Sequence, residues 1–130
     1  MIELSVRTSG REDPVDLTER IQQEVNRHGI DTGVCTVFCP HTTAGLTINE
    51  AADPSVMQDL FAYLSRLVPD DGAWTHAEGN SPAHVKATLV GSSLTIGIDA
   101  GRLELGTWQG IFLCEFDGPR NRTVKLRILG

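Results

Sequence analysis

Apolar and polar residues alternate at the start of the chain, and this two-residue period predicts a strand. Residues 2–8 place Ile2, Leu4 and Val6 on one side and charged or hydroxyl side chains on the other. Successive side chains of a strand point to opposite faces, so one face of this strand is expected to be buried. Alternation and β-prone composition predict further strands over residues 33–39, 46–49, 94–98, 102–105, 110–116 and 123–129.

A period of four residues predicts a helix after the first strand. Leu17, Ile21 and Val25 recur at this spacing, Asp16 precedes them in the form of a capping box, and Gly29 marks the end. One face of this helix is therefore expected to pack on the core.

Two further helices are predicted to begin at prolines. Asp53-Pro54 combines an N-cap with a proline in the first turn, and apolar residues at helical spacing continue to Val68. Ser81-Pro82 begins a shorter helix that stops at Gly91. The polar segment 69–80 between them is predicted to be a long loop.

Strands at both ends with helices between them predict an α+β fold. We expect a largely antiparallel, β-sandwich-like sheet with about three helices. A chain of 130 residues buries one ordinary core, so residues 1–130 are expected to form a single domain.

Charge and composition narrow the possible partners and the compartment. The net charge of −6 opposes the phosphate backbone, so no nucleic-acid partner is expected. No segment approaches the ~20 apolar residues of a spanning helix, and the first residues do not resemble a signal peptide. Three cysteines without a CxxC pair fit a reducing compartment. We therefore expect a cytoplasmic protein with no membrane contact.

Three of the four histidines lie where the chain is predicted to bend. His41 follows the second strand, His76 lies in the long loop, and His84 lies in the first turn of the last helix. Three neutral imidazoles with one open position are a common catalytic zinc site. We therefore predict a divalent metal, with zinc as the first candidate, on His41, His76 and His84. Exposed loop histidines without a metal are the alternative.

Residues 39–50 offer further polar groups beside the first of these histidines. Thr42, Thr43 and Asn49 are candidates for binding an anion, and Glu50 is a candidate for orienting an imidazole or moving a proton. The same residue types fit a strand turn with surface threonines equally well.

Residues 107–109 form another candidate binding segment. Trp108 between Thr107 and Gln109 has the composition of a pocket wall with two hydrogen-bonding neighbours. A tryptophan in such a setting is more often a core or subunit contact. No nucleophile elbow, P-loop or dinucleotide-binding glycine motif occurs, which argues against those enzyme classes.

Three segments together resemble the YjbQ family of small proteins, often labelled secondary thiamine-phosphate synthases. They are residues 39–50 (CPHTTAGLTINE), 78–86 (EGNSPAHVK) and 105–120 (LGTWQGIFLCEFDGPR). The resemblance implies an α+β domain with a β-sandwich-like core, a homotrimer, and a polar cleft near the subunit boundary. It also implies a site at His41, His76 and His84 with a metal such as zinc, and it includes Glu50 and residues 107–109 in the same signature.

The family label implies a transferase that joins a pyrimidine diphosphate to a thiazole phosphate and expels pyrophosphate. Such chemistry needs positive charge near the leaving group, for which Lys86, Arg102 and Arg120 are candidates. We predict a metal-dependent enzyme that acts on a small phosphorylated or anionic metabolite. A non-catalytic small-molecule- or metal-binding protein is the alternative.

Overall fold

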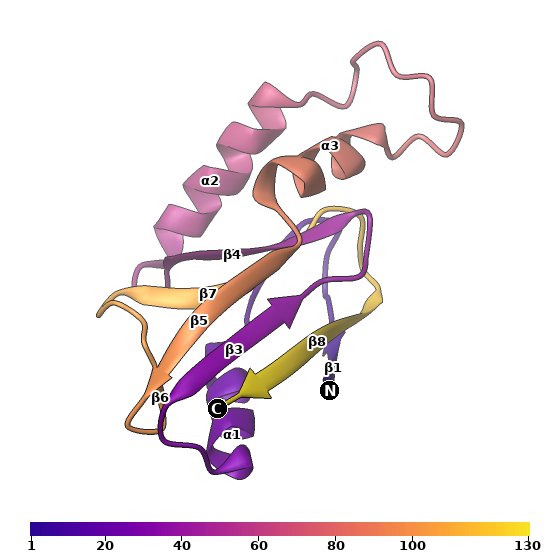
Figure 1. Ribbon diagram of the computed structural model, residues 1–130. Coiled ribbons are helices and arrows are strands. Elements are labelled where there is room, and N and C mark those ends of the chain that lie inside the picture. The colour runs from indigo at the N-terminus through magenta and orange to yellow at the C-terminus, as the bar shows by residue number, and fades with distance from the viewer.

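Two antiparallel sheets form the frame of the protein in the computed structural model of residues 1–130 (Figure 1). The larger sheet has the strand order β1 (Ile2–Arg7), β8 (Asn121–Leu129), β3 (Gly33–Phe38), β5 (Ser93–Asp99) and β6 (Arg102–Leu103). The smaller sheet has the order β2 (Asp13–Asp16), β7 (Gln109–Glu115) and β4 (Ala44–Glu50). All neighbouring strands are antiparallel, so the predicted α+β fold with a largely antiparallel sheet is confirmed.

Three helices lie where the sequence predicts them, at α1 (Thr18–His28), α2 (Pro54–Leu67) and α3 (Ser81–Val90). Asp53 caps α2 by accepting a hydrogen bond from Ser55 N–H at 3.0 Å. Gly29 ends α1 with a left-handed φ of 79°, which glycine adopts without steric cost. None of these helices combines the length and apolarity needed to cross a membrane.

The start of α1 differs from the predicted capping box. The N-cap residue is Leu17, and its apolar side chain makes no capping hydrogen bond. Asp16 instead accepts from both the backbone N–H of Thr18, at 2.9 Å, and the Thr18 hydroxyl, at 2.6 Å. The Asp16 carboxylate therefore orders the first turn of α1 from the residue that precedes the N-cap.

The sequence pattern did not predict the short strand β2. It is only four residues long and contains Pro14, which cannot donate a ladder hydrogen bond. Such a strand is tolerated at a sheet edge, and β2 pairs with β7 alone.

The smaller sheet separates two apolar cores. Side chains of both sheets and of α1 form the larger core, whereas α2 and α3 cover the opposite face of the smaller sheet and form a second core (Figure 1). Strand β7 contributes to both, because Ile111 and Leu113 enter the first core while Phe112 and Cys114 enter the second. This double burial explains why β7 is apolar almost throughout.

A buried ion pair fixes α3 to the rest of the chain. Lys86 Nζ lies 2.7 Å from Glu12 Oε2 and 3.1 Å from Ser65 Oγ in α2. The Lys86 side chain is 6% exposed and that of Glu12 is 29% exposed. Lys86 therefore joins α3 to α2 and to the segment before β2.

We expect Lys86→Met to lower the free energy of unfolding by about 2–3 kcal/mol. The substitution keeps the apolar stem but leaves the Glu12 carboxylate without its partner, at a site somewhat less buried than a fully internal ion pair. Urea unfolding measures the loss. Arg11→Met is the control, because its ion pair with Asp70 is exposed and contributes less than about 1 kcal/mol. Equal losses in the two variants would contradict the structural role of Lys86.

Candidate functional site

The three predicted histidines line one polar cleft. His41, His76 and His84 share it with Arg120 and Arg122, and its volume is about 380 Å³. This volume lies in the range of small-molecule sites. The structure therefore brings His41 and His84 into one cleft, although they are more than 40 positions apart in the sequence. Their positions at predicted bends had suggested that they could meet.

Chain topology explains this convergence. Strand β8 runs antiparallel to β3, and their pairing ends at Phe38 opposite Lys125. The first residues of β8 therefore continue past the end of β3 and lie beside the connection that carries His41. Helix α3 is held beside the cleft because its C-terminal end lies close to β4. The N–H of Leu46 donates there to Gly91 O at 2.9 Å.

Glycine at position 45 permits this close approach of α3 to β4. A Cβ atom at Gly45 would lie only 2.6 Å from Gly91 O, so any larger residue would push the helix away. Gly45 thus helps to place His84, in the first turn of α3, at the cleft.

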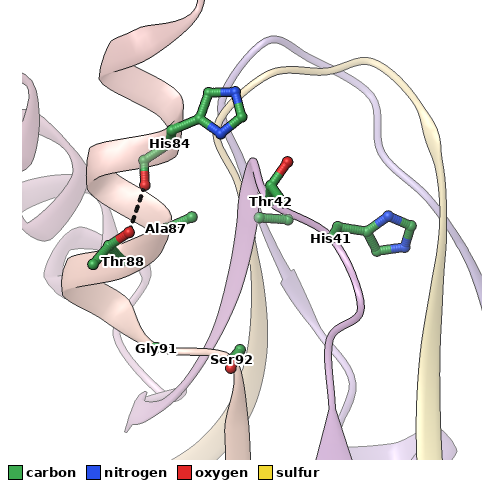
Figure 2. Close-up of a pocket in the computed structure, with 8 residues that line it drawn as sticks. His41, Thr42, His84, Ala87, Thr88, Gly91 and Ser92 are labelled. Carbon is green, nitrogen blue, oxygen red and sulfur yellow. Dashed lines mark hydrogen bonds between the residues drawn. The ribbon is translucent and has the colours of Figure 1, made fainter.

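An adjoining hollow extends the cleft along α3. His41, Thr42 and His84 line both hollows, and Thr88 and Ser92 continue the second one (Figure 2). In Figure 2 the ring of His41 is turned toward β8, whereas the ring of His84 projects from the helix in another direction. The two imidazoles face shared space without pointing toward each other.

One nitrogen of His41 is held by the backbone of β8. His41 Nε2 lies 2.9 Å from Thr123 N and 3.2 Å from Thr123 O, so Thr123 can serve either tautomer of the ring. Nδ1 is therefore the nitrogen left for a ligand. Burial of the imidazole, assisted by the nearby Arg122 guanidinium, lowers the pKa of His41 below its usual value and favours the neutral ring at pH 7.

The other two histidines form a pair at the rim of the cleft. The ring centroids of His76 and His84 are 5.2 Å apart with an interplanar angle of 82°. Their nitrogens suit a transition metal chemically. However, no three His, Cys, Asp or Glu side chains are arranged to hold a metal ion. In this arrangement the three histidines do not form a metal centre.

A buried ion pair underlies the cleft. Glu115 is fully buried and Arg122 is 5% exposed. Glu115 Oε1 accepts from Arg122 Nε at 2.8 Å and from Thr8 Oγ1 at 2.8 Å, while Arg122 Nη2 contacts the other carboxylate oxygen. Arg122 Nη2 also donates to Thr43 Oγ1 at 2.8 Å, which joins the pair to the loop of His41.

Arg122 is a cleft residue that the sequence reasoning did not identify. It belongs to a group of four basic residues near the end of the chain, Arg120, Arg122, Lys125 and Arg127, and such a pattern is typical of a solvated strand face. The alternation of the strand could have identified it. Arg122 lies on the same face of β8 as Val124 and Leu126, which are buried. A basic residue in a buried register requires a partner, which here is Glu115.

Several predicted site residues lie away from the histidines. Thr42 and Thr43 do line the cleft. Asn49 and Glu50 lie at the other end of β4, about 20 Å along the strand from its first residue.

The remaining predicted site residues also lie outside the cleft. Lys86 is paired with Glu12. Trp108, flanked by Thr107 and Gln109, is 64% exposed and lies near the Glu50 end of β4. Within one chain, these residues do not meet the histidines.

These features define an α+β protein with stacked antiparallel sheets and a histidine-lined polar cleft. A family model described as "UPF0047 protein YjbQ-like" matches residues 2–130. The chain therefore belongs to the YjbQ/UPF0047 family, as the three resembling segments predicted.

Related sequences and structures cover almost the whole chain. UPF0047 protein MJ1081 of Methanocaldococcus jannaschii is 48% identical over 100% of this chain and 94% of its own length. UPF0047 protein YugU of Bacillus subtilis is 43% identical over 98% of this chain and 97% of its own length.

The fold is also shared with solved structures. An uncharacterised YjbQ/UPF0047-family protein from Clostridium acetobutylicum superposes with a TM-score of 0.97 at 50% identity, covering 99% of this chain and 100% of that one. A YbjQ-like protein of unknown function from Sulfolobus solfataricus gives 0.94 at 34% identity, covering 99% and 95%. The fold and the family are therefore established together.

The buried pair predicts how stability depends on acid. Burial alone would raise the pKa of Glu115, but hydrogen bonds from Arg122 and Thr8 outweigh it and hold the pKa below the usual 4.5. A carboxyl group with a lowered folded pKa binds fewer protons than in the unfolded chain, so its stabilisation is complete above the usual pKa and is lost as pH falls below it.

We therefore expect Glu115→Gln to flatten the loss of stability in acid. The variant is less stable than the wild type at pH 7 by about 3 kcal/mol, because Arg122 loses its countercharge. The difference in free energy of unfolding should shrink as the pH is lowered below the usual carboxyl pKa. Urea unfolding across this range measures it, with Glu3→Gln on the exposed face of β1 as the control. A constant difference at every pH would argue against this role of Glu115.

Proposed function

We propose that the protein is an enzyme that acts on a small phosphorylated or otherwise anionic metabolite bound in the histidine cleft. The observation that carries this proposal is the meeting of His41, His76 and His84 with two arginines around one cavity. Imidazole groups move protons near neutral pH, and guanidinium groups bind oxyanions.

The charges of the lining favour an anion. Arg120 and Arg122 line the cleft, whereas Glu78 is its one acidic lining residue and is largely exposed at the rim. Asn80, the N-cap of α3, also lines the cleft, so the partial positive charge of this helix end lies beside it. A dianionic phosphate group would be attracted by both.

Proton transfer is assigned to the histidines. Burial and the nearby Arg122 lower the pKa of His41 and favour its neutral form, and its Nδ1 is free of the backbone contact that holds Nε2. A neutral imidazole fixed on one side is suited to accept or donate a proton on the other. The thiamine-phosphate synthase reaction associated with the family label is the first transfer reaction to test, because its pyrophosphate leaving group matches the cationic lining.

A divalent metal such as zinc is part of this proposal. His76 and His84 would supply adjacent ligands. His41 would join them through Nδ1, with Thr123 still holding Nε2, once the three rings moved closer together. A bound zinc ion would stabilise negative charge that develops on the substrate.

Elemental analysis of the untagged protein tests the metal. We expect roughly one ion per chain in the wild type and little in His41→Ala or His84→Ala, as for a site with three protein ligands. His28→Ala, at the end of α1, is the control and should retain the ion. Wild-type protein purified without metal, and unable to bind added zinc, would remove the metal from the proposal while leaving the anion site to be tested separately.

Screening phosphorylated metabolites by thermal shift, followed by product analysis, separates an enzyme from a binding protein. Product formation that is lost in His84→Ala supports catalysis. Tight binding without product from any candidate would favour the non-catalytic alternative.

We also propose that the chain assembles as a homotrimer in the cytoplasm. Apolar side chains remain exposed on the larger sheet, including Phe38 at 45% and Leu129 at 60%, and Trp108 is 64% exposed at one end of the smaller sheet. Exposed apolar surface of this kind is typical of subunit contacts.

Sedimentation equilibrium should therefore give the mass of three chains. Because burial of apolar surface drives such association, the trimer is expected to persist at high salt. A mass of one chain over the whole concentration range would contradict the assembly.

A further inference from the structure

We propose that Arg122 is the oxyanion-binding residue of the cleft. Two of its guanidinium nitrogens hold Glu115 and Thr43, and the third, Nη1, binds a phosphate or carboxylate group of the ligand. This inference rests on the proposed function, because it names the group that recognises the anion in the same cleft.

The hydrogen bonds of the guanidinium group leave one edge free. Nε donates to Glu115 Oε1 at 2.8 Å, and Nη2 donates to the other Glu115 oxygen and to Thr43 Oγ1. These bonds use the single hydrogen of Nε and both hydrogens of Nη2. The two hydrogens of Nη1 have no partner within the chain.

The free edge of Arg122 is accessible from the cleft. Nη1 of Arg122 has no hydrogen-bond partner. Among side-chain nitrogen and oxygen atoms without a partner, only Asn80 Oδ1 is fully buried. Nη1 is therefore at least partly exposed. Arg122 lines the cleft. Its two unpaired N–H groups are therefore available to a ligand there.

Arg122 is held in place before a ligand arrives. The residue is 5% exposed, and its contacts with Glu115 and Thr43 fix the side chain from two directions. An exposed arginine loses rotamer freedom when it binds, whereas this loss has already occurred for Arg122. Arg120, by comparison, has a side chain that is 51% exposed and binds Asp117 with both Nε and Nη2.

Glu115 both supports and opposes the bound anion. It supplies the countercharge that allows the guanidinium to be buried, and it orients the free edge toward the cleft. It also repels an anion bound at Nη1, since charges separated by one guanidinium group interact strongly in a partly buried site. Removing the Glu115 charge should therefore strengthen anion binding, while replacing Arg122 should weaken it.

Nitrogen-15 NMR of the arginine side chains in the wild-type protein tests the assignment directly. Inorganic phosphate is titrated in, and the Nη1 resonances of Arg122 are expected to shift and saturate while those of Arg127, on β8 away from the cleft, stay constant. A parallel titration with acetate distinguishes a phosphate site from a general carboxylate site.

The possible results separate this inference from the proposed function. If amide resonances of Thr42 and His84 shift with phosphate but Arg122 Nη1 does not, the cleft binds an anion and the role of Arg122 is refuted. If no cleft resonance responds to phosphate or acetate, the anion-binding part of the proposed function fails as well.

Two variants with opposite expected signs provide the second test. Arg122→Lys should weaken phosphate binding about tenfold or more, because lysine lacks the second edge of the guanidinium fork. Glu115→Gln should tighten it roughly threefold or more, because the repelling charge is gone. Arg127→Lys is the matched control and should not change the affinity. Affinities measured by calorimetry on variants with native-like NMR spectra that all equal the wild-type value would overturn the inference.

Discussion

The buried pair of Glu115 and Arg122 is the interaction on which the rest of the site depends. Charges removed from water are tolerated only when their hydrogen-bonding capacity is filled. Here Thr8, Thr43 and the backbone N–H of Asp117 fill this capacity, except at Nη1 of Arg122, which has no partner within the chain. Because Glu115 is the last residue of β7 and Arg122 is the second residue of β8, the pair fixes the junction between the smaller and the larger sheet.

Two consecutive residues of β8 position the histidine loop from this junction. Arg122 binds Thr43 through its side chain, and Thr123 binds the ring of His41 through its backbone. The backbone groups of Thr123 are available to His41 because the pairing of β3 with β8 ends at Lys125. The loop is consequently held at both its imidazole and its second threonine. Burial, assisted by the nearby guanidinium, lowers the pKa of this imidazole and favours its neutral form.

Local patterns predicted most of the fold because they report burial directly. The three helices and the main strands follow from apolar periods and from caps such as Asp53, but β2 is too short and polar to carry a period. The convergence of the three histidines was predicted from bends and from the family resemblance. Arg122 was missed because its function depends on a partner seven residues away, in the preceding strand.

Residues that are adjacent in a motif are not adjacent in space when a strand separates them. The segment that begins near His41 continues through β4 to Glu50, and an extended strand of this length covers about 20 Å. Strand β4 cannot fold back, because it is paired with β7 along its whole length and covered by α2 and α3. A contribution of Glu50 or Trp108 to chemistry in the histidine cleft would therefore have to come from a second copy of the chain. Whether Glu50 and Trp108 belong to the site therefore depends on how copies of the chain assemble.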